Sequence, residues 1–271
     1  MVFANQIEEG LASGLFYDRL AVPFYLSPDK VESDYSPVRF ARELKLFRSF
    51  CPNGSVLDVG CSTGAFLFQL KTRFDGDYEI AGIDVAGPAL DYAEQKGIPV
   101  LRESFLRSDF GSKRFDAITF WAVIEHLDKP GEFLAKAASL LRPSGLCFIL
   151  VPNLSSLAVR LLGAKYRYIF PQHLNYFNPT TLRLFAANTP RLRIVHTTST
   201  HFNPIVIWQD WRGSGQFVAD ESRAKLLKQT TAYKQNPILQ PLKLGLSIVE
   251  ALLSRCNLAD NIVVVLQKVG L

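Results

Sequence analysis

The fold is decided by residues 55–64, which read Ser-Val-Leu-Asp-Val-Gly-Cys-Ser-Thr-Gly. An apolar run ends here in a turn with two glycines, and a helical pattern follows from Ala65 to Arg73. Glycine lets the backbone turn sharply and lets a ligand approach main-chain N–H groups, while the N-terminus of a helix attracts a carboxylate. We therefore expect a strand, a ligand-binding loop and a helix in direct succession.

The alternation of apolar runs and helical patterns continues toward the C-terminus. Such alternation predicts βαβ units and a parallel sheet, and near-continuous apolar strands indicate that helices cover both faces. A turn at 142–145 is expected to lead into the fifth strand, and Asn178 to cap a later helix. The expected strands are 55–59, 79–85, 98–101, 115–121, 146–151, 192–198 and 262–267, with helices at 65–73, 88–96, 131–141 and about 178–187.

Two segments lie outside this seven-stranded core. Residues 1–50 predict an N-terminal helical arm with a helix at 37–50, and residues 201–260 predict an insertion, mostly helical from about Ser222. The expected organisation is an arm or lid at 1–50, a main domain at 51–200, an insertion or cap at 201–260 and a final strand at 261–271. Aromatic side chains of the arm either pack on the core or form a lid; they are Phe16, Tyr17, Phe24, Tyr25 and Tyr35.

Composition excludes several classes of protein. Apolar residues make up 48% and charged residues 20% of the 271 residues, which excludes global disorder. The net charge of +5 is mild, and no dense Lys/Arg run favours a nucleic-acid partner. The four cysteines form no C-x-x-C pair, and the first ten residues lack a signal-peptide design, so we expect a cytoplasmic protein without a zinc or disulfide framework.

The loop pattern separates two kinds of nucleotide cofactor. A dinucleotide-binding loop needs G-x-G-x-x-G, whereas this chain has Gly60-x-Ser62-x-Gly64 behind Asp58. Twenty residues after Gly64, the second expected strand ends at Asp84. A carboxylate at a strand end can accept two strong hydrogen bonds from ribose hydroxyls. The loop therefore does not fit the dinucleotide-binding pattern.

The segment Asp58-x-Gly60-x-Ser62-x-Gly64 resembles motif I of the class I S-adenosylmethionine-dependent methyltransferases, D/E-x-G-x-G-x-G, with Ser62 at the middle glycine. Residues 115–127 and 172–177 resemble the branch that includes ubiquinone-biosynthesis O-methyltransferase and many sugar and natural-product methyltransferases. The resemblance covers residues 50–200 and the last ten residues. It implies a Rossmann-like, mostly parallel sheet of order 3-2-1-4-5-7-6 with strand 7 antiparallel.

The resemblance also implies where S-adenosyl-L-methionine, the expected cofactor, binds. The loop wraps the methionine end and the ribose edge, Asp84 accepts from the ribose hydroxyls, and Val85 lies beside the adenine. The cofactor-binding residues implied are Asp58, Gly60, Cys61, Ser62, Gly64, Asp84, Val85, Ser104, Phe105, Trp121 and Ala122.

His126 and His173 are the candidate catalytic bases. A neutral imidazole at the mouth of the cleft can accept a proton from the acceptor. The alternative for His126 is a surface turn after the fourth strand, and His173 is equally ambiguous. Methyl transfer from a sulfonium is an in-line displacement that needs no metal, so we expect no metal site.

The expected function is methyl transfer to a small-molecule or saccharide/lipid-intermediate acceptor, on oxygen or nitrogen. A non-catalytic cofactor-binding scaffold and a nicotinamide-dependent oxidoreductase are the alternatives. Leucines and other apolar residues at helical spacing within 238–253 predict a cap helix, with a dimer face or a shallow membrane contact as alternatives. The chain is expected to be a monomer or a homodimer.

Overall fold

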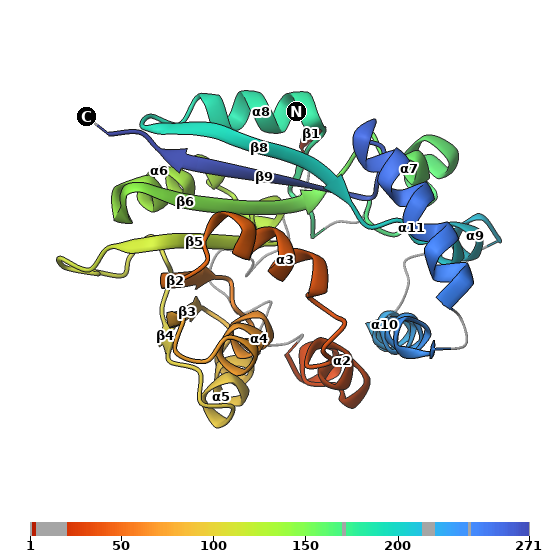
Figure 1. The fold of residues 1–271 in the computed structure, drawn as a ribbon, viewed down its shortest axis with the longest axis horizontal. Helices are drawn as coiled ribbons and strands as arrows, with labels where there is room; N and C mark the ends of the chain where they lie inside the picture. Colours follow the sequence, from red (N-terminus) through yellow and green to blue (C-terminus); the bar gives the residue numbers. More distant parts are fainter. Residues whose placement is uncertain (1, 4–20, 170–171, 213–219, 238–239, 271) are drawn as a thin grey trace.

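The computed structural model describes residues 2–3, 21–169, 172–212, 220–237 and 240–270. Its centre is a seven-stranded sheet of order β4-β3-β2-β5-β6-β9-β8, in which β9 runs antiparallel to both neighbours (Figure 1). Numbered in chain order within this sheet, the order is 3-2-1-4-5-7-6, so the predicted topology is confirmed. The strands are β2 Gly54–Val59, β3 Tyr78–Asp84, β4 Val100–Arg102, β5 Phe115–Trp121, β6 Leu141–Pro152, β8 Leu192–Thr200 and β9 Asn261–Lys268.

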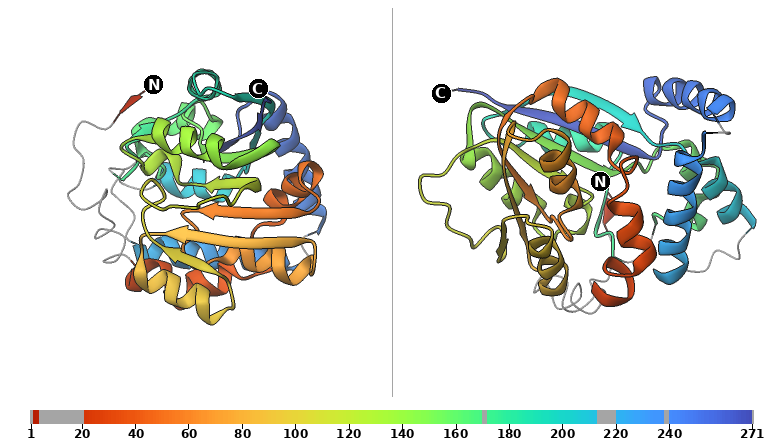
Figure 2. Two further views of the ribbon diagram at one scale, coloured as in Figure 1. Left: turned by 90° about the vertical axis from the view of Figure 1, so that its left-hand side faces the viewer. Right: turned by 60° about the horizontal axis from the view of Figure 1, so that its bottom comes forward.

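Helices cover both faces of this sheet (Figures 1 and 2). Successive residues of a strand point to opposite faces of the sheet. Val56 and Leu57 are both fully buried, but they belong to two different apolar clusters, one on each face. One face carries α3 Ala41–Phe50, α4 Ala65–Arg73 and α5 Gly87–Gln95, and the other carries α6 Pro130–Leu140 and α8 Pro179–Ala187. The predicted two-sided core is therefore present.

Local signals set the ends of α8 as expected. The Asn178 side chain accepts from the Thr181 N–H at 2.8 Å, and the Thr181 hydroxyl oxygen accepts from the Asn178 N–H at 2.9 Å. This reciprocal capping box satisfies two donors that the first helical turn leaves without partners.

The fifth strand of the large sheet begins earlier than predicted. Residues 142–145 do not precede the strand but lie inside β6, because Leu141 already pairs with Phe115. A register irregularity between Phe115 and Ala117 accommodates the turn, and Asp116 stabilises it by accepting from the Ser55 N–H at 2.8 Å and from Arg142 at 2.5 Å.

The arm and the insertion contain more structure than the sequence indicated. The predicted helix at 37–50 begins at Ala41, and the short helix α2 Pro28–Asp34 precedes it. In the insertion, α9 Pro204–Arg212 precedes α10 Asp220–Gln235 and α11 Gln240–Arg255, so helical structure starts before Ser222. The helix α7 Leu157–Leu162 and a small sheet of β1 Val2–Phe3 and β7 Asn175–Tyr176 were not predicted. Phe16 and Tyr17 lie outside the described residues.

The arm and the insertion are joined by polar contacts around the described residues of α2, α3 and α10. Ser33 on α2 and Thr231 on α10 lie 2.5 Å apart through their hydroxyls, and α10 lies beside α2 (Figure 1). Glu43 on α3 accepts from the His201 imidazole at 2.5 Å. Glu43 is buried, which alone raises its pKa, but His201 and Arg39 outweigh burial and lower that pKa to about 2.

We expect Glu43→Gln to destabilise the fold by about 1.5–3 kcal/mol at pH 6, the contribution of a hydrogen bond to a charged group. Because the pKa of the folded state lies below the ordinary value of 4.5, this contribution is present above pH 4.5 and is lost as the pH falls toward 2. Urea unfolding at pH 6, 4 and 3 measures it. The exposed Glu32→Gln, which removes an ion pair with Lys228, is the control. A pH-independent difference between Glu43→Gln and the wild type would contradict the assignment.

Candidate functional site

The carboxyl ends of β2, β3, β5 and β6 open into a cavity of about 1180 Å³. Parallel α/β sheets bind ligands at this edge. The cavity is lined by the loop after β2, by the ends of β3 and β5, and also by residues of the arm and the insertion. One wall of the cavity therefore consists of the predicted cofactor site. The second wall consists of residues of the arm and the insertion.

The loop after β2 has the backbone that its glycines predicted. Gly60 has φ +73, and a Cβ there would lie 2.6 Å from a methyl group of Val123 on the exit of β5. Ser62, at the middle position of the motif, also adopts a positive φ of +51. A small residue without β-branching tolerates this conformation better than a bulky one, which explains how serine replaces glycine here.

Asp84 holds this loop in place. Its carboxylate accepts from the Ser62 N–H at 2.8 Å, and from the N–H groups of Val85 and Ala86 at 2.7 and 3.1 Å. The end of β3 is thereby joined to the loop after β2. Both Asp84 and Val85 line the cavity, as the expected ribose and adenine contacts require.

Asp58, near the end of β2, also lines the cavity. It is 3% exposed and accepts from the Thr119 hydroxyl at 2.6 Å. Burial raises the pKa of Asp58 to about 7 against the opposing effect of that hydrogen bond. The carboxyl is thus tied to β5 and also faces the site.

The remaining predicted cofactor residues divide into two groups. Cys61 lines the cavity, but its sulfur packs where Gly82 of β3 lacks a Cβ, and Gly64 is not a lining residue because it faces Ala93 and Ile98. Gly64 therefore serves packing of the loop on α5. Four others line the cavity; they are Ser104, Phe105, Trp121 and Ala122.

The β5 exit has two features that the sequence did not reveal. Ala122 has a positive φ of +58, which is uncommon for a residue with a Cβ. The indole Nε1 of Trp121 is buried without a hydrogen-bond partner among the described residues, and its ring packs on Phe66 at 5.1 Å. A buried donor at a cavity wall is a natural contact for a polar ligand atom.

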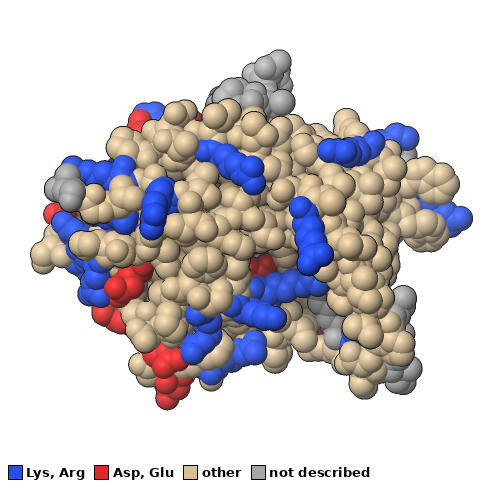
Figure 3. Space-filling view, turned by 45° about the horizontal axis from the view of Figure 1, so that its top comes forward, with Lys and Arg blue, Asp and Glu red and all other residues tan. Residues whose placement is uncertain are grey.

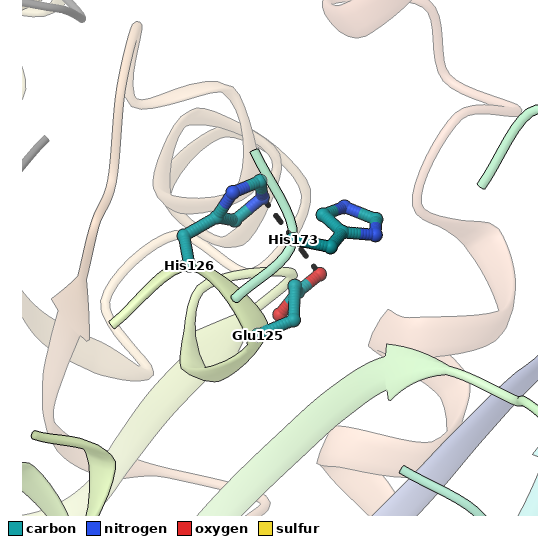
Figure 4. Close-up of side chains that lie close together, drawn as sticks. All are labelled: Glu125, His126 and His173. Atoms are coloured by element: carbon teal, nitrogen blue, oxygen red, sulfur yellow. Dashed lines mark ion pairs between the residues drawn. The ribbon is translucent and has the colours of Figure 1, made fainter. Parts of the chain in front are cut away.

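His126 and His173 lie together at the cavity, with ring centroids 4.7 Å apart (Figure 4). His126 follows β5 on the short helix η2 Ile124–His126, and His173 lies on the segment before β7. The Nδ1 of each ring lies 2.9 Å from a backbone carbonyl, that of Gln172 for His126 and that of Tyr168 for His173. Because a carbonyl only accepts, Nδ1 carries the hydrogen and the lone pair lies on Nε2. Both rings can therefore act as bases at Nε2.

Glu125 is a third member of this cluster. It is 1% exposed, and neither carboxylate oxygen has a hydrogen-bond partner among the described residues. Burial raises the pKa of Glu125 to about 8. One ligand atom from each of Glu125, His126 and His173 lies within 4.8 Å of the others, so these residues are also able to hold a metal ion.

Several cavity residues were missed by sequence reasoning. Glu43 Oε2 and Tyr233 OH are buried without a hydrogen-bond partner in the described part of the chain, and the buried side chains of Tyr166 and Asp260 interact with each other. Burial raises the pKa of Asp260 to about 7. These residues belong to the arm, to the insertion and to the segment after β6, where no motif marks them.

The fold and this site define a nucleotide-cofactor α/β domain, and comparison with known proteins identifies its family. A family model described as "Methyltransferase domain" matches residues 35–189, more than half of the chain. The chain therefore belongs to this family, among the class I S-adenosylmethionine-dependent methyltransferases. The predicted cofactor, S-adenosylmethionine, is confirmed at the level of the family.

Two relatives are named ubiquinone biosynthesis O-methyltransferase. The protein of Caulobacter vibrioides is 32% identical over 152 residues, which cover 50% of this chain and 58% of that protein. The protein of Burkholderia orbicola is 28% identical over 163 residues, which cover 55% of this chain and 68% of that protein. The match thus spans 58% of the first relative and about two thirds of the second.

Solved structures share the fold at low sequence identity. A [4+2]-cyclase, SpnF, matches with a TM-score of 0.58 and 14% identity over 100% of both chains. A SAM-dependent methyltransferase from Archaeoglobus fulgidus matches with a TM-score of 0.52 and 19% identity, over 93% of this chain and 100% of that chain. This likeness confirms the fold. The roles of the individual site residues stay predictions.

We expect Asp84→Ala to weaken binding of S-adenosylhomocysteine by about 10- to 100-fold, because it removes charge-assisted hydrogen bonds worth about 1.5–3 kcal/mol and releases the loop. Isothermal titration calorimetry measures the affinity. Asp91→Ala, an exposed carboxylate of α5 paired with Arg102, is the matched control. Unchanged affinity in Asp84→Ala would remove Asp84 from the cofactor site.

Proposed function

We propose that this protein transfers the methyl group of S-adenosylmethionine to a small-molecule or saccharide/lipid-intermediate acceptor, at a hydroxyl oxygen or an amine nitrogen. One observation carries the proposal: the cofactor loop and the histidine pair line the same cavity. Ligand pockets commonly measure about 300–1,000 Å³, so a cavity of 1180 Å³ has room for a cofactor and an acceptor together.

The site fits the cofactor on grounds of shape and of polar atoms. A Cβ on Gly60 would fill the cradle that the loop forms against Val123, and Asp84 offers a fixed carboxylate at the end of β3. When bound, S-adenosylmethionine supplies an electrophilic methyl group on a positively charged sulfur. The loop and Asp84 would hold the cofactor, and the β5 exit around Trp121 and Ala122 would orient its methionine end.

The histidines would prepare the acceptor. The Nε2 atom of His126 or of His173 takes the proton of an acceptor hydroxyl as the oxygen attacks, and the backbone carbonyl bonded to Nδ1 keeps the ring in the required tautomer. Holding the two reactants in line supplies about 7–11 kcal/mol of the barrier. The arm and the insertion, which also line the cavity, would contact the acceptor.

The lining of the second wall favours an acceptor that is both polar and apolar. Glu43, Asp260 and the hydroxyls of Tyr166 and Tyr233 offer hydrogen bonds. Aromatic and aliphatic side chains lie between them; they include Phe24, Tyr25, Phe202, Val206, Leu226 and Leu246. On the face drawn in Figure 3, Lys and Arg lie apart among uncharged residues over the upper part and close to Asp and Glu at the lower left, an arrangement that gives no support to a nucleic-acid acceptor.

We expect replacement of the catalytic base, His126 or His173, by alanine to lower turnover by about 10²–10⁴-fold. The acceptor is identified by incubating the protein with methyl-tritiated S-adenosylmethionine and fractionated small-molecule and lipid extracts, and by finding the fraction that becomes labelled. The rate of labelling of that acceptor then measures turnover. His196→Ala on β8 is the control, because His196 packs on Phe50 and does not line the cavity. Full turnover in both variants would exclude base catalysis by these residues. Cofactor binding without transfer to any fraction would favour a non-catalytic scaffold.

The insertion supports a second proposal, a peripheral membrane contact. α11 turns Leu246 and Glu250 toward the cavity and exposes Leu244, Ile248 and Leu252. α9 exposes Ile205, Trp208 and Trp211 beside the cation Arg212. None of the described helices is long and apolar enough to cross a membrane. Ile238 and Leu239, which belong to the predicted segment 238–253, lie outside the described residues.

Sedimentation with vesicles of phosphatidylcholine and an anionic phospholipid tests this contact. We expect Trp208→Ala/Trp211→Ala to reduce bound protein by at least about fivefold, because tryptophan anchors at the interface and cations attract anionic lipid. Leu161→Ala, an exposed apolar residue of α7, is the control. Wild-type protein that stays in the supernatant would exclude the contact.

A further inference from the structure

The cluster of Glu125, His126 and His173 has the composition of a metal site. One potential ligand atom from each residue lies within 4.8 Å of the others, and Glu125 Oε1 lies 4.0 Å from His126 Nε2. Figure 4 shows the Glu125 carboxyl group next to the pair of rings, with the three side chains converging from η2 and from the segment before β7. Ligands of a zinc-sized ion lie about 2.0–2.2 Å from the metal, so small side-chain rotations bring these atoms into range.

Glu125 provides the second, independent observation. Its side chain is 1% exposed and lines the cavity, yet both oxygens are buried without a hydrogen-bond partner in the part of the chain that the structure describes. A carboxylate loses several kcal/mol by burial unless a cation or hydrogen-bond donors replace water. Among the described ion pairs, its only contact is the 4.0 Å approach of His126. No Lys or Arg within the described ranges pairs with it.

The histidines are oriented as metal-bound histidines usually are. Each holds its Nδ1 2.9 Å from a backbone carbonyl, which fixes the tautomer and the ring plane. Metal-ligating histidines almost always donate their other ring N–H to a carbonyl or carboxylate in this way. The same contacts serve a catalytic base, so they support a metal only together with Glu125.

We propose that Glu125, His126 and His173 bind one divalent transition-metal ion at the acceptor side of the cavity. Two imidazoles and one carboxylate suit zinc, iron, cobalt or manganese, whereas magnesium prefers oxygen ligands and keeps its waters. All three residues line the cavity, so the open coordination positions face the space for the acceptor. This site replaces our expectation that the protein has no metal site.

The role of the ion follows from the proposed function, on which this part of the inference rests. A bound acceptor hydroxyl oxygen becomes more acidic because the cation stabilises the oxyanion. With the ion bound, the histidines would be its ligands and would not act as the bases described under the proposed function, so the proton of the acceptor hydroxyl would pass to water at the mouth of the cavity. The ion would thus hold the acceptor oxygen in place and activate it for attack on the methyl carbon.

Metal binding is tested on the full chain without a polyhistidine tag, after treatment with a chelator. Titration with Co²⁺, followed by its visible absorption, and with Zn²⁺ by calorimetry should show one ion per chain. We expect Glu125→Gln, His126→Ala and His173→Ala each to weaken Zn²⁺ binding by more than about 100-fold, the upper end of the loss caused by removing an outer-shell partner. His196→Ala should bind Zn²⁺ like the wild type, and Mg²⁺ should not compete.

Binding of S-adenosylhomocysteine is measured on the same variants and reports that each is folded. Wild-type protein that binds no Co²⁺ or Zn²⁺, or binding that survives Glu125→Gln and His173→Ala, would overturn the metal site and leave the histidines as bases. Metal binding with no methyl transfer to any extract would instead overturn the proposed function and leave the site in place. The two proposals therefore fail in different measurements.

Discussion

The hydrogen bond from the Ser62 N–H to the Asp84 carboxylate is the contact on which the site depends. It joins the loop after β2 to the end of β3, and the same carboxylate also accepts from the first two N–H groups beyond that strand. Gly60 also lies close to Val123, so the segment that follows β5 packs against the same loop. Three strand ends are thus fixed relative to one another before any ligand binds.

This arrangement requires uncommon backbone conformations. Ser62 and Ala122 both have positive φ, and both lie where the predicted cofactor would meet main-chain groups. Such conformations persist only where the surrounding packing determines them, and they concentrate at functional sites. The core around β2 and β5, fully buried at Leu57, Ile118 and Phe120, supplies that packing.

The second half of the cavity is built differently, from segments that ion pairs and hydrogen bonds hold against the sheet. Glu250 on α11 pairs with Arg42 and accepts from the His201 N–H, while His201 also contacts Glu43. These contacts connect the arm to both ends of the insertion. Removing one partner of such a buried pair leaves an uncompensated charge, so these contacts keep the arm and the insertion in fixed positions.

Much of the fold and the cofactor half of the site could be predicted from sequence for a physical reason. Hydrophobic periodicity and the signals for turns and helix ends involve only neighbouring residues. They therefore predicted the strand and loop at 55–64, the acid at Asp84 and the Asn178 cap. The start of β6 was misplaced because Asp116 and Arg142, 26 residues apart, stabilise a turn inside the strand. Tyr166, Tyr233 and Asp260 meet at the cavity only through tertiary packing, and no local pattern marks them.

Glu125 shows why the chemistry is decided outside the cofactor motif. The methyltransferase fold hosts more than one reaction, so the fold and donor leave the acceptor step open. Among the described residues, Glu125 has both carboxylate oxygens buried without a hydrogen-bond partner, and it lies next to two oriented imidazoles. A carboxylate in that position is stabilised by a cation or else stays protonated at neutral pH, since burial raises its pKa to about 8. Under the two proposals, the first state would activate an acceptor by coordination and the second would leave the histidines to act as bases, so the occupancy of this cluster would determine how the acceptor loses its proton.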